Sequence, residues 1–146
     1  MDTLLAFTLN GLLGGLFATA AMTWIIRQLG LEELLPAPMF WARHIADGDP
    51  DEYHTGPRLL HYTYGVLAGG IFGAILASTP INPAEIAIVT GMSITFSFIL
   101  FVIARRFWLP VVIGFKPDPE QIKEYLLFHI VYGSVLGPWM SLQLPF

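Results

Sequence analysis

The sequence predicts an all-α integral membrane protein with four transmembrane helices, and two observations lead to this fold class. First, only 12% of the 146 residues are charged and 55% are apolar, with a mean hydropathy of +0.64, whereas soluble domains usually have about 25% charged residues. Second, four long uncharged runs, residues 3–26, 59–78, 86–104 and 125–146, each have about the length of one membrane crossing. Because lipid offers the backbone no hydrogen bonds, all four runs should be helical.

The four helices are expected at about residues 3–28, 57–78, 83–107 and from 118 onward. Thr55 or Gly56 can cap the second helix. Asp118 is the expected N-cap of the fourth, with Gln121 completing a capping box. The short turn at residues 79–83 should join the second and third helices as an antiparallel hairpin. Asn10, in the first helix, should either hydrogen-bond to another helix or line a polar pathway.

Two connections separate these helices. In residues 29–56, Pro36 and Pro38 argue against one continuous helix. Apolar residues alternate there with charged ones, so the segment is expected to lie among the lipid headgroups, anchored by Trp41. Residues 108–117 are apolar but too short to cross a bilayer, and we interpret them as a re-entrant or interfacial loop.

Glycines at helical spacing give three of the predicted helices a face with few side chains. They recur every fourth residue in the second helix, and pairs four residues apart occur in the fourth and first helices. These helix-packing glycines are Gly65, Gly69 and Gly73, then Gly133 and Gly137, and finally Gly11 and Gly15. Such a face lets another backbone come close in lipid, so tight helix packing is expected there.

The basic residues predict the orientation of the chain in the membrane. All seven lie at the end where the first and third helices finish and the second and fourth begin: Arg27, Arg43, Arg58, Arg105, Arg106, Lys116 and Lys123. By the positive-inside rule, this end faces the cytoplasm. The predicted localisation is therefore the cell (inner) membrane, multi-pass, with both termini outside and the long connections cytoplasmic.

A sequence repeat divides the predicted single domain, residues 1–146, into two halves of about 1–80 and 81–146. Residues 59–69 align with 127–137, and five of the eleven pairs are identical. The shared motif is H-x-x-Y-G-x-x-x-G, which begins at His61 and again at His129. Both copies begin at the cytoplasmic end, so we expect two helix pairs related as a parallel repeat.

The two motifs, together with GLFATAAMT in the first helix and MFWAR at residues 39–43, resemble an uncharacterised family of four-helix membrane proteins found in haloarchaea and other prokaryotes. The resemblance covers most of the chain. It implies the four-helix topology and carries over no activity.

The two motifs also place an ionisable residue and a tyrosine on the glycine-rich faces. His61 shares a face with Tyr64, and His129 with Tyr132. Three interpretations remain open. The histidines can be interfacial structural residues that bond a carbonyl, hydroxyl or headgroup. They can bind a haem iron axially or share a metal. They can also line a transport or proton path with both tyrosines and Asn10.

The sequence favours a non-catalytic role. It contains no nucleophile–base pair, phosphate loop or metal signature such as HExxH. The net charge of −4 argues against a nucleic-acid partner. We therefore expect an accessory or assembly subunit of a larger membrane complex, with the lipid bilayer, other membrane subunits or a second copy as partners. No cofactor is expected. The alternatives are a small transporter or proton-path protein, or a bundle that binds a b-type haem or a metal through His61 and His129.

Overall fold

The computed structural model describes residues 3–32, 35–49, 52 and 54–142, and this part of the chain is helical without strands. In chain order the elements are α1 (Thr3–Gln28), α2 (Pro36–His44), α3 (Thr55–Ala77), α4 (Ile86–Ile103), the π-helix η3 (Ala104–Ile113) and α5 (Pro119–Ser141). The all-α class predicted from the sequence is confirmed.

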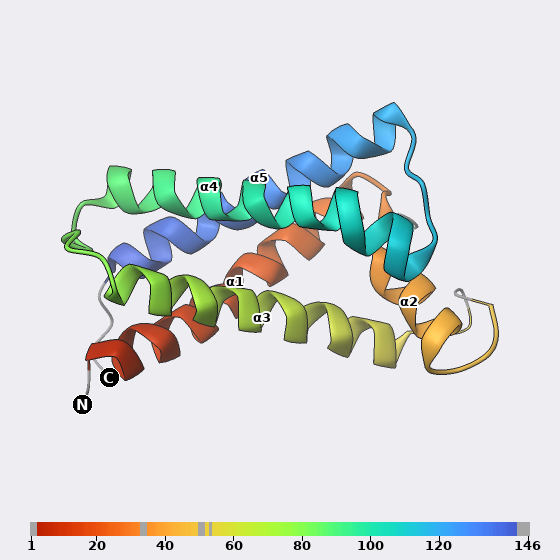
Figure 1. Ribbon diagram of the computed structural model, residues 1–146, viewed down its shortest axis with the longest axis horizontal. Coiled ribbons are helices and arrows are strands. Elements are labelled where there is room, and N and C mark those ends of the chain that lie inside the picture. Colours follow the sequence, from red (N-terminus) through yellow and green to blue (C-terminus); the bar gives the residue numbers. More distant parts are fainter. Residues whose placement is uncertain (1–2, 33–34, 50–51, 53, 143–146) are drawn as a thin grey trace.

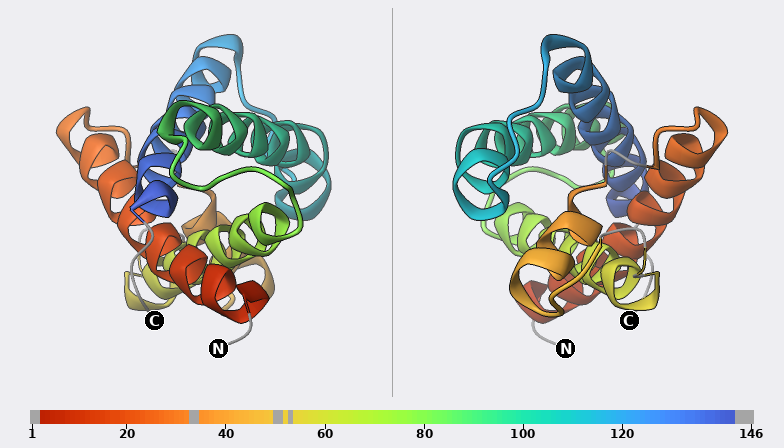
Figure 2. Two further views of the ribbon diagram at one scale, coloured as in Figure 1. Left: turned by 90° about the vertical axis from the view of Figure 1, so that its left-hand side faces the viewer. Right: turned by 90° about the vertical axis from the view of Figure 1, so that its right-hand side faces the viewer.

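The four long helices lie in two layers. Helices α3 and α4 run antiparallel in one layer, and α1 and α5 cross each other in the layer behind (Figures 1 and 2). Helix α1 packs along α3, α4 packs along α5, and α1 meets α5. The backbones of α3 and α4 have hardly any contact. The bundle is therefore an open chain of neighbours, in the order α3, α1, α5 and α4.

The two ends of the bundle differ. One end holds the start of α1, the end of α5 and the turn between α3 and α4, whereas α2 and η3 lie at the other (Figure 1). The basic residues belong to this second end, which we call the basic end. There Arg27 lies in the last turn of α1, Arg43 lies in α2, and Arg105 and Arg106 lie in η3.

Three helical segments are long and apolar enough to cross a membrane: Thr3–Gln28, Thr55–Ala77 and Ile86–Ile113. Large apolar side chains cover their outer faces, for example Phe17, Leu67, Ile71 and Phe98, each at least half exposed. Such faces suit contact with a lipid bilayer, as expected of a membrane protein. Helix α5 is 23 residues long, but it does not meet the same criterion.

Two clusters of buried apolar side chains fill the bundle. The cluster nearer the turn between α3 and α4 consists of Ala18, Ala68, Phe72, Leu76, Val89, Tyr132, Leu136 and Met140. The cluster at the basic end consists of Ile26, Phe101, Leu109, Ile113, Tyr125 and Phe128. Both clusters contain residues of α1, α5 and the segment α4–η3. This packing therefore holds α1 and α5 where they cross each other.

The structure corrects three details predicted from the sequence. The loop expected at residues 108–117 is wrong, because the helix continues to Ile113 and ends at Gly114 with φ 74°. Burial of Leu109 and Ile113 favours a helix here, and the wider π winding accommodates the missing N–H of Pro110. Helix α3 begins at Thr55, so neither Thr55 nor Gly56 caps it. Helix α4 begins at Ile86 rather than at residue 83.

Other local predictions are confirmed. Asp118 caps α5 by accepting hydrogen bonds from the backbone N–H groups of Glu120 and Gln121, and Gln121 completes the capping box. Residues 29–56 do not form one continuous helix. Their short helix α2 carries both prolines in its first turn, where a missing N–H breaks no helical hydrogen bond.

Candidate functional site

The four residues singled out by the repeated motif lie around one cavity. His61 and Tyr64 of α3 and His129 and Tyr132 of α5 all line it, and its volume is about 210 Å³. The cavity lies in the half of the bundle toward the basic end, where α3 and α4 are not packed together. We call it the apolar cavity, because most of the side chains around it are hydrocarbon.

Apolar side chains from all the neighbouring helices form its walls. They include Met22 and Ile26 of α1, Leu60 of α3, Leu100 and Ile103 of α4, and Phe128 of α5. Phe40 of α2 and Trp108 of η3 stack with ring centroids 5.3 Å apart and cover the cavity at the basic end. Farther toward the opposite end, Phe72 and Phe96 fill the space between α3 and α4, with centroids 5.4 Å apart.

Hydrogen bonds hold three of the four motif side chains, the two of α5 described here and His61 of α3 described below. The hydroxyl of Tyr132 donates to the carbonyl of Gly65 over 2.6 Å, which ties α5 to α3. The Nδ1 atom of His129 donates to the carbonyl of Tyr125 over 2.7 Å, within α5. The fourth side chain, Tyr64, is 49% exposed.

His61 binds to α1 through a threonine. The Oγ1 atom of Thr23 donates to the carbonyl of Thr19 over 2.8 Å and lies 3.2 Å from Nε2 of His61. A hydroxyl has one proton to donate, so Nε2–H of His61 is the donor in this second bond. These donor assignments define the tautomers of the neutral rings, in which Nδ1 of His61 and Nε2 of His129 carry no proton.

The glycines of α3 lie against the glycines of α1. A Cβ atom added at Gly69 would lie 2.6 Å from Cα of Gly15, and one added at Gly11 would lie 3.1 Å from Cα of Gly73. The added Cβ of Gly65 would meet the side chain of Thr19. Contacts this close are possible only without side chains, so the glycines bring α1 and α3 together backbone to backbone.

The glycines of α5 lie against α4 in a similar way. A Cβ atom at Gly137 would lie 2.5 Å from Cα of Thr90, and one at Gly133 would lie 2.8 Å from Cα of Ile94. Ser93 and Ser97 are buried on this face of α4, and their hydroxyl groups have no hydrogen-bond partner within the described part of the chain. Small residues on both helices therefore set the distance between α4 and α5.

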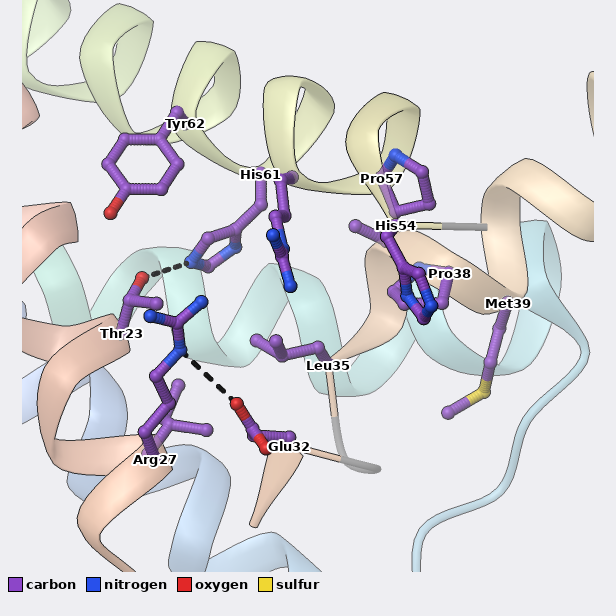
Figure 3. Close-up of a pocket in the computed structure, with 13 residues that line it drawn as sticks. Thr23, Arg27, Glu32, Leu35, Pro38, Met39, His54, Pro57, His61 and Tyr62 are labelled. Carbon is purple, nitrogen blue, oxygen red and sulfur yellow. Dashed lines mark hydrogen bonds and ion pairs between the residues drawn. The ribbon is translucent and has the colours of Figure 1, made fainter. Parts of the chain in front are cut away.

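A second, larger cavity adjoins the first at the basic end. Its volume is about 610 Å³, and we call it the polar chamber (Figure 3). Its charged residues and histidines come from the end of α1, the following connection and the start of α3, and they are Arg27, Glu32, His54, Arg58 and His61. Arg27 pairs with Glu32 at 3.2 Å. His61 lines both cavities, as do Ile26, Leu35 and Ala37.

Asn10 lies away from the histidines. It is buried where α1 crosses α5 and accepts a hydrogen bond of 2.9 Å from Nε1 of Trp139. The predicted interhelical hydrogen bond of Asn10 is thereby confirmed. Asn10 lines neither cavity. These two cavities therefore do not form the transport or proton path that was expected to run from the histidines to Asn10.

Sequence reasoning missed two features of this end of the molecule. The first is the polar chamber, because Arg58 was interpreted only as a sign of orientation and His54 was assigned no role. The second is the contact of α2 with the end of η3: the side chain of Arg43 donates to the carbonyl of Ile113, and Nε2 of His44 lies 2.8 Å from the carbonyl of Val112. These partners are about 70 residues apart, and no local pattern connects them.

Comparisons with protein-family models, curated proteins and solved structures find no match for this chain. Among the described residues, no group of three or more His, Cys, Asp or Glu side chains is placed to hold a metal ion. The two adjoining cavities are therefore the features on which a function can be argued.

Proposed function

We propose that this protein is a non-catalytic integral membrane protein with four membrane-spanning helices, and that it binds an apolar ligand in the cavity between α3 and α4. One observation carries this proposal: the apolar cavity lies where the two helices of one layer are not packed together. A hydrocarbon group there would make dispersion contacts with Leu60, Leu100 and Phe128, and each pair of carbon atoms in contact gains about 0.1–0.2 kcal/mol.

The packing of α5 supports a fourth membrane crossing. Helix α5 contacts α1 and lies against α4 through Gly133 and Gly137. It begins at the basic end and finishes beside the start of α1 (Figure 1). If α1, α3 and α4 cross the bilayer, α5 is held within the same thickness. By the positive-inside rule, the basic end is cytoplasmic and both termini are outside the cell membrane.

The contacts also support two helix pairs of common origin. In the first pair, Gly65 of α3 lies against Thr19 of α1. In the second, the corresponding Gly133 of α5 lies against Ser97 of α4. Each motif glycine thus meets a hydroxyl residue of the preceding long helix, as expected of a parallel repeat.

The two other sequence hypotheses about the histidines receive less support. A transport path needs polar groups across the membrane, and the cavity that holds His61 and His129 does not reach Asn10. A haem needs a large flat space between its ligands. The volume of about 210 Å³ is below the roughly 300–1,000 Å³ of pockets that enclose drug-sized ligands.

A second candidate is the accessory subunit expected from the sequence, and Gly91 of α4 favours it. The other helical glycines of the described chain lie against a neighbouring element, whereas a Cβ added at Gly91 would meet nothing within 4 Å. A glycine on an outward face lets a helix of another subunit approach. The motif glycines are already engaged within the chain and offer no such face.

Mass spectrometry of the intact protein, released from a phosphatidylcholine nanodisc, tests ligand binding. We expect dodecanol to bind with one-to-one stoichiometry. Ala104 lines the apolar cavity, so Ala104→Phe should fill it and abolish binding. Ala87→Phe changes an exposed residue of α4, in the same continuous helical segment 86–113, and should leave binding unchanged. Equal dodecanol binding by both variants would contradict the proposal.

Purification in a mild detergent tests the accessory role. Membrane subunits that co-purify with the protein should be lost on Gly91→Leu and retained on Ser134→Leu, at an exposed position of α5. Retention of the same subunits by both variants would exclude Gly91 as the contact face.

A further inference from the structure

We infer that the ligand is an anionic, single-chain amphiphile, with its acid group on Arg58 in the polar chamber and its hydrocarbon chain in the apolar cavity. The inference rests on the proposed function, because it names the class of ligand for the same cavity. It follows from the continuity of the two spaces, from their charge and from their volumes.

The two spaces share a wall. His61, Ile26, Leu35 and Ala37 line both of them. The ring of His61 points toward Thr23 of α1 at this boundary (Figure 3). A ligand that follows the shared wall therefore meets charged groups on one side of His61 and hydrocarbon on the other, which is the arrangement that an amphiphile matches.

The charge of the polar chamber favours an acid. Glu32 neutralises Arg27 through the 3.2 Å ion pair. Arg58 lines the same chamber and has no ion-pair partner within the described residues. One guanidinium group is thus available to a ligand, and a guanidinium binds a phosphate or carboxylate through two parallel hydrogen bonds.

The start of α3 adds to this preference. Its first turn forms part of the chamber through Pro57 and Arg58, and its N-cap residue, His54, makes no side-chain capping bond. The N-terminal end of a helix carries a partial positive charge, which favours an anion. The helix end and the guanidinium group of Arg58 therefore act in the same direction.

The volumes favour a single chain. The apolar cavity, at about 210 Å³, is smaller than a pocket for a whole ligand, which is roughly 300–1,000 Å³. The polar chamber, at about 610 Å³, leaves room for a headgroup with its water. Together the two spaces suit one headgroup and one hydrocarbon chain, and a second chain would have to lie outside the cavity.

The test compares three probes on the protein in phosphatidylcholine nanodiscs: dodecyl phosphate, dodecanol and inorganic phosphate. We expect dodecyl phosphate to bind at least about tenfold more tightly than dodecanol, because a hydrogen bond to a charged group adds that much affinity. Inorganic phosphate should bind far more weakly than either. If inorganic phosphate binds as tightly as dodecyl phosphate, the site takes a soluble anion and the inference is wrong.

Two pairs of variants separate the two parts of the site. Arg58→Gln should weaken dodecyl phosphate about tenfold and leave dodecanol within twofold, whereas Arg105→Gln, at an exposed position of η3, should change neither. Ala104→Phe should weaken both probes, and Ala87→Phe neither. If Ala104→Phe does not fold, as judged by circular dichroism and gel filtration, Ala104→Leu replaces it with the same expectation.

The outcomes distinguish the inference from the proposed function. Equal binding of dodecanol and dodecyl phosphate, both sensitive to Ala104→Phe, would overturn the anionic headgroup and keep the apolar site. If Arg58→Gln and Arg105→Gln weaken dodecyl phosphate binding equally, the binding depends on the general positive charge of the surface and not on Arg58. That result would also overturn the inference. Binding that is insensitive to Ala104→Phe would overturn both.

Discussion

Gly69 lies in close contact with the backbone of α1, and its missing side chain is what permits the contact. The Cβ of an alanine here would lie 2.6 Å from Cα of Gly15 and closer still to the carbonyl oxygen of Gly11. Both neighbours are backbone atoms, which cannot turn aside as a side chain can. Relief of the clash would require the two helices to separate.

Gly69→Ala should therefore lower the free energy of unfolding by about 3 kcal/mol or more, at the upper end of the usual cost of overpacking. The matched control is Gly91→Ala, in α4, where the new Cβ meets open space. That change should leave stability unchanged or raise it by up to about 1 kcal/mol through helix propensity. Unfolding of both purified variants in mixed micelles measures the difference, and equal stabilities would rule out the close contact.

Ser97 presents the opposite case, because its buried hydroxyl has no hydrogen-bond partner within the described chain. Ser97→Ala should raise the free energy of unfolding by about 1 kcal/mol, since an unsatisfied buried polar group is costly. Thr19→Val is the comparison: the hydroxyl of Thr19 donates to the carbonyl of Gly15 over 2.7 Å, and its removal should lower stability by about 1 kcal/mol. The same unfolding assay should give opposite signs, and a destabilised Ser97→Ala would reveal a partner for that hydroxyl.

At the scale of elements, α2 holds the end of η3. The side chains of Arg43 and His44 contact the carbonyls of Ile113 and Val112, which are left without helical partners at the end of η3. A cation suits this position because the C-terminal end of a helix is partially negative. The contact closes the basic end of the bundle over the stacked rings of Phe40 and Trp108.

Arg43→Met should loosen this contact without disturbing the rest of the bundle. We expect hydrogen exchange at residues 36–44 and 109–113 to become about tenfold faster, which corresponds to the loss of about 1.4 kcal/mol from a charged hydrogen bond. Exchange in α1 should not change. Arg105→Met, at an exposed position of η3, is the control, and equal effects of the two variants would contradict the anchoring role.

Local signals predicted some elements and could not predict others. The capping box at Asp118 and the absence of a continuous helix over residues 29–56 depend on neighbouring residues, and both are found. The helical course of residues 104–113 depends on burial of Leu109 and Ile113 in the basic-end cluster. The short apolar run over residues 108–117 pointed to a loop, because no local pattern reports tertiary burial.

The candidate site was predictable in one respect. The repeated motif singled out His61 and His129, and both line the apolar cavity. The cavity itself arises because α3 and α4 do not pack together, although the short turn between them predicted a hairpin. The space between α3 and α4 depends on the angles at which they cross α1 and α5. The sequences of α3 and α4 alone do not determine these angles.

At the scale of the whole molecule, the four-span topology that we propose would place the basic end in the cytoplasm by the positive-inside rule. The chain has no cysteine, so single cysteines can be introduced without background. In intact cells, a membrane-impermeant maleimide should label Thr79→Cys and Leu142→Cys but not Lys116→Cys, which should react only after permeabilisation. Labelling of Lys116→Cys and Leu142→Cys from the same side would show that α5 does not cross the membrane.

The helices pack in the order α3, α1, α5 and α4, which leaves the apolar cavity between α3 and α4. The central claim is that a hydrocarbon chain occupies that cavity. Protection of a cysteine at position 104, a residue of the cavity wall, tests it most directly. The account predicts that dodecyl phosphate slows the reaction of Ala104→Cys with N-ethylmaleimide at least about fivefold. The bound probe covers the thiol, so the rate falls with the fraction of protein that is occupied. The outward-facing Ala87→Cys should be unaffected. Equal reaction rates of Ala104→Cys with and without the probe would contradict the account.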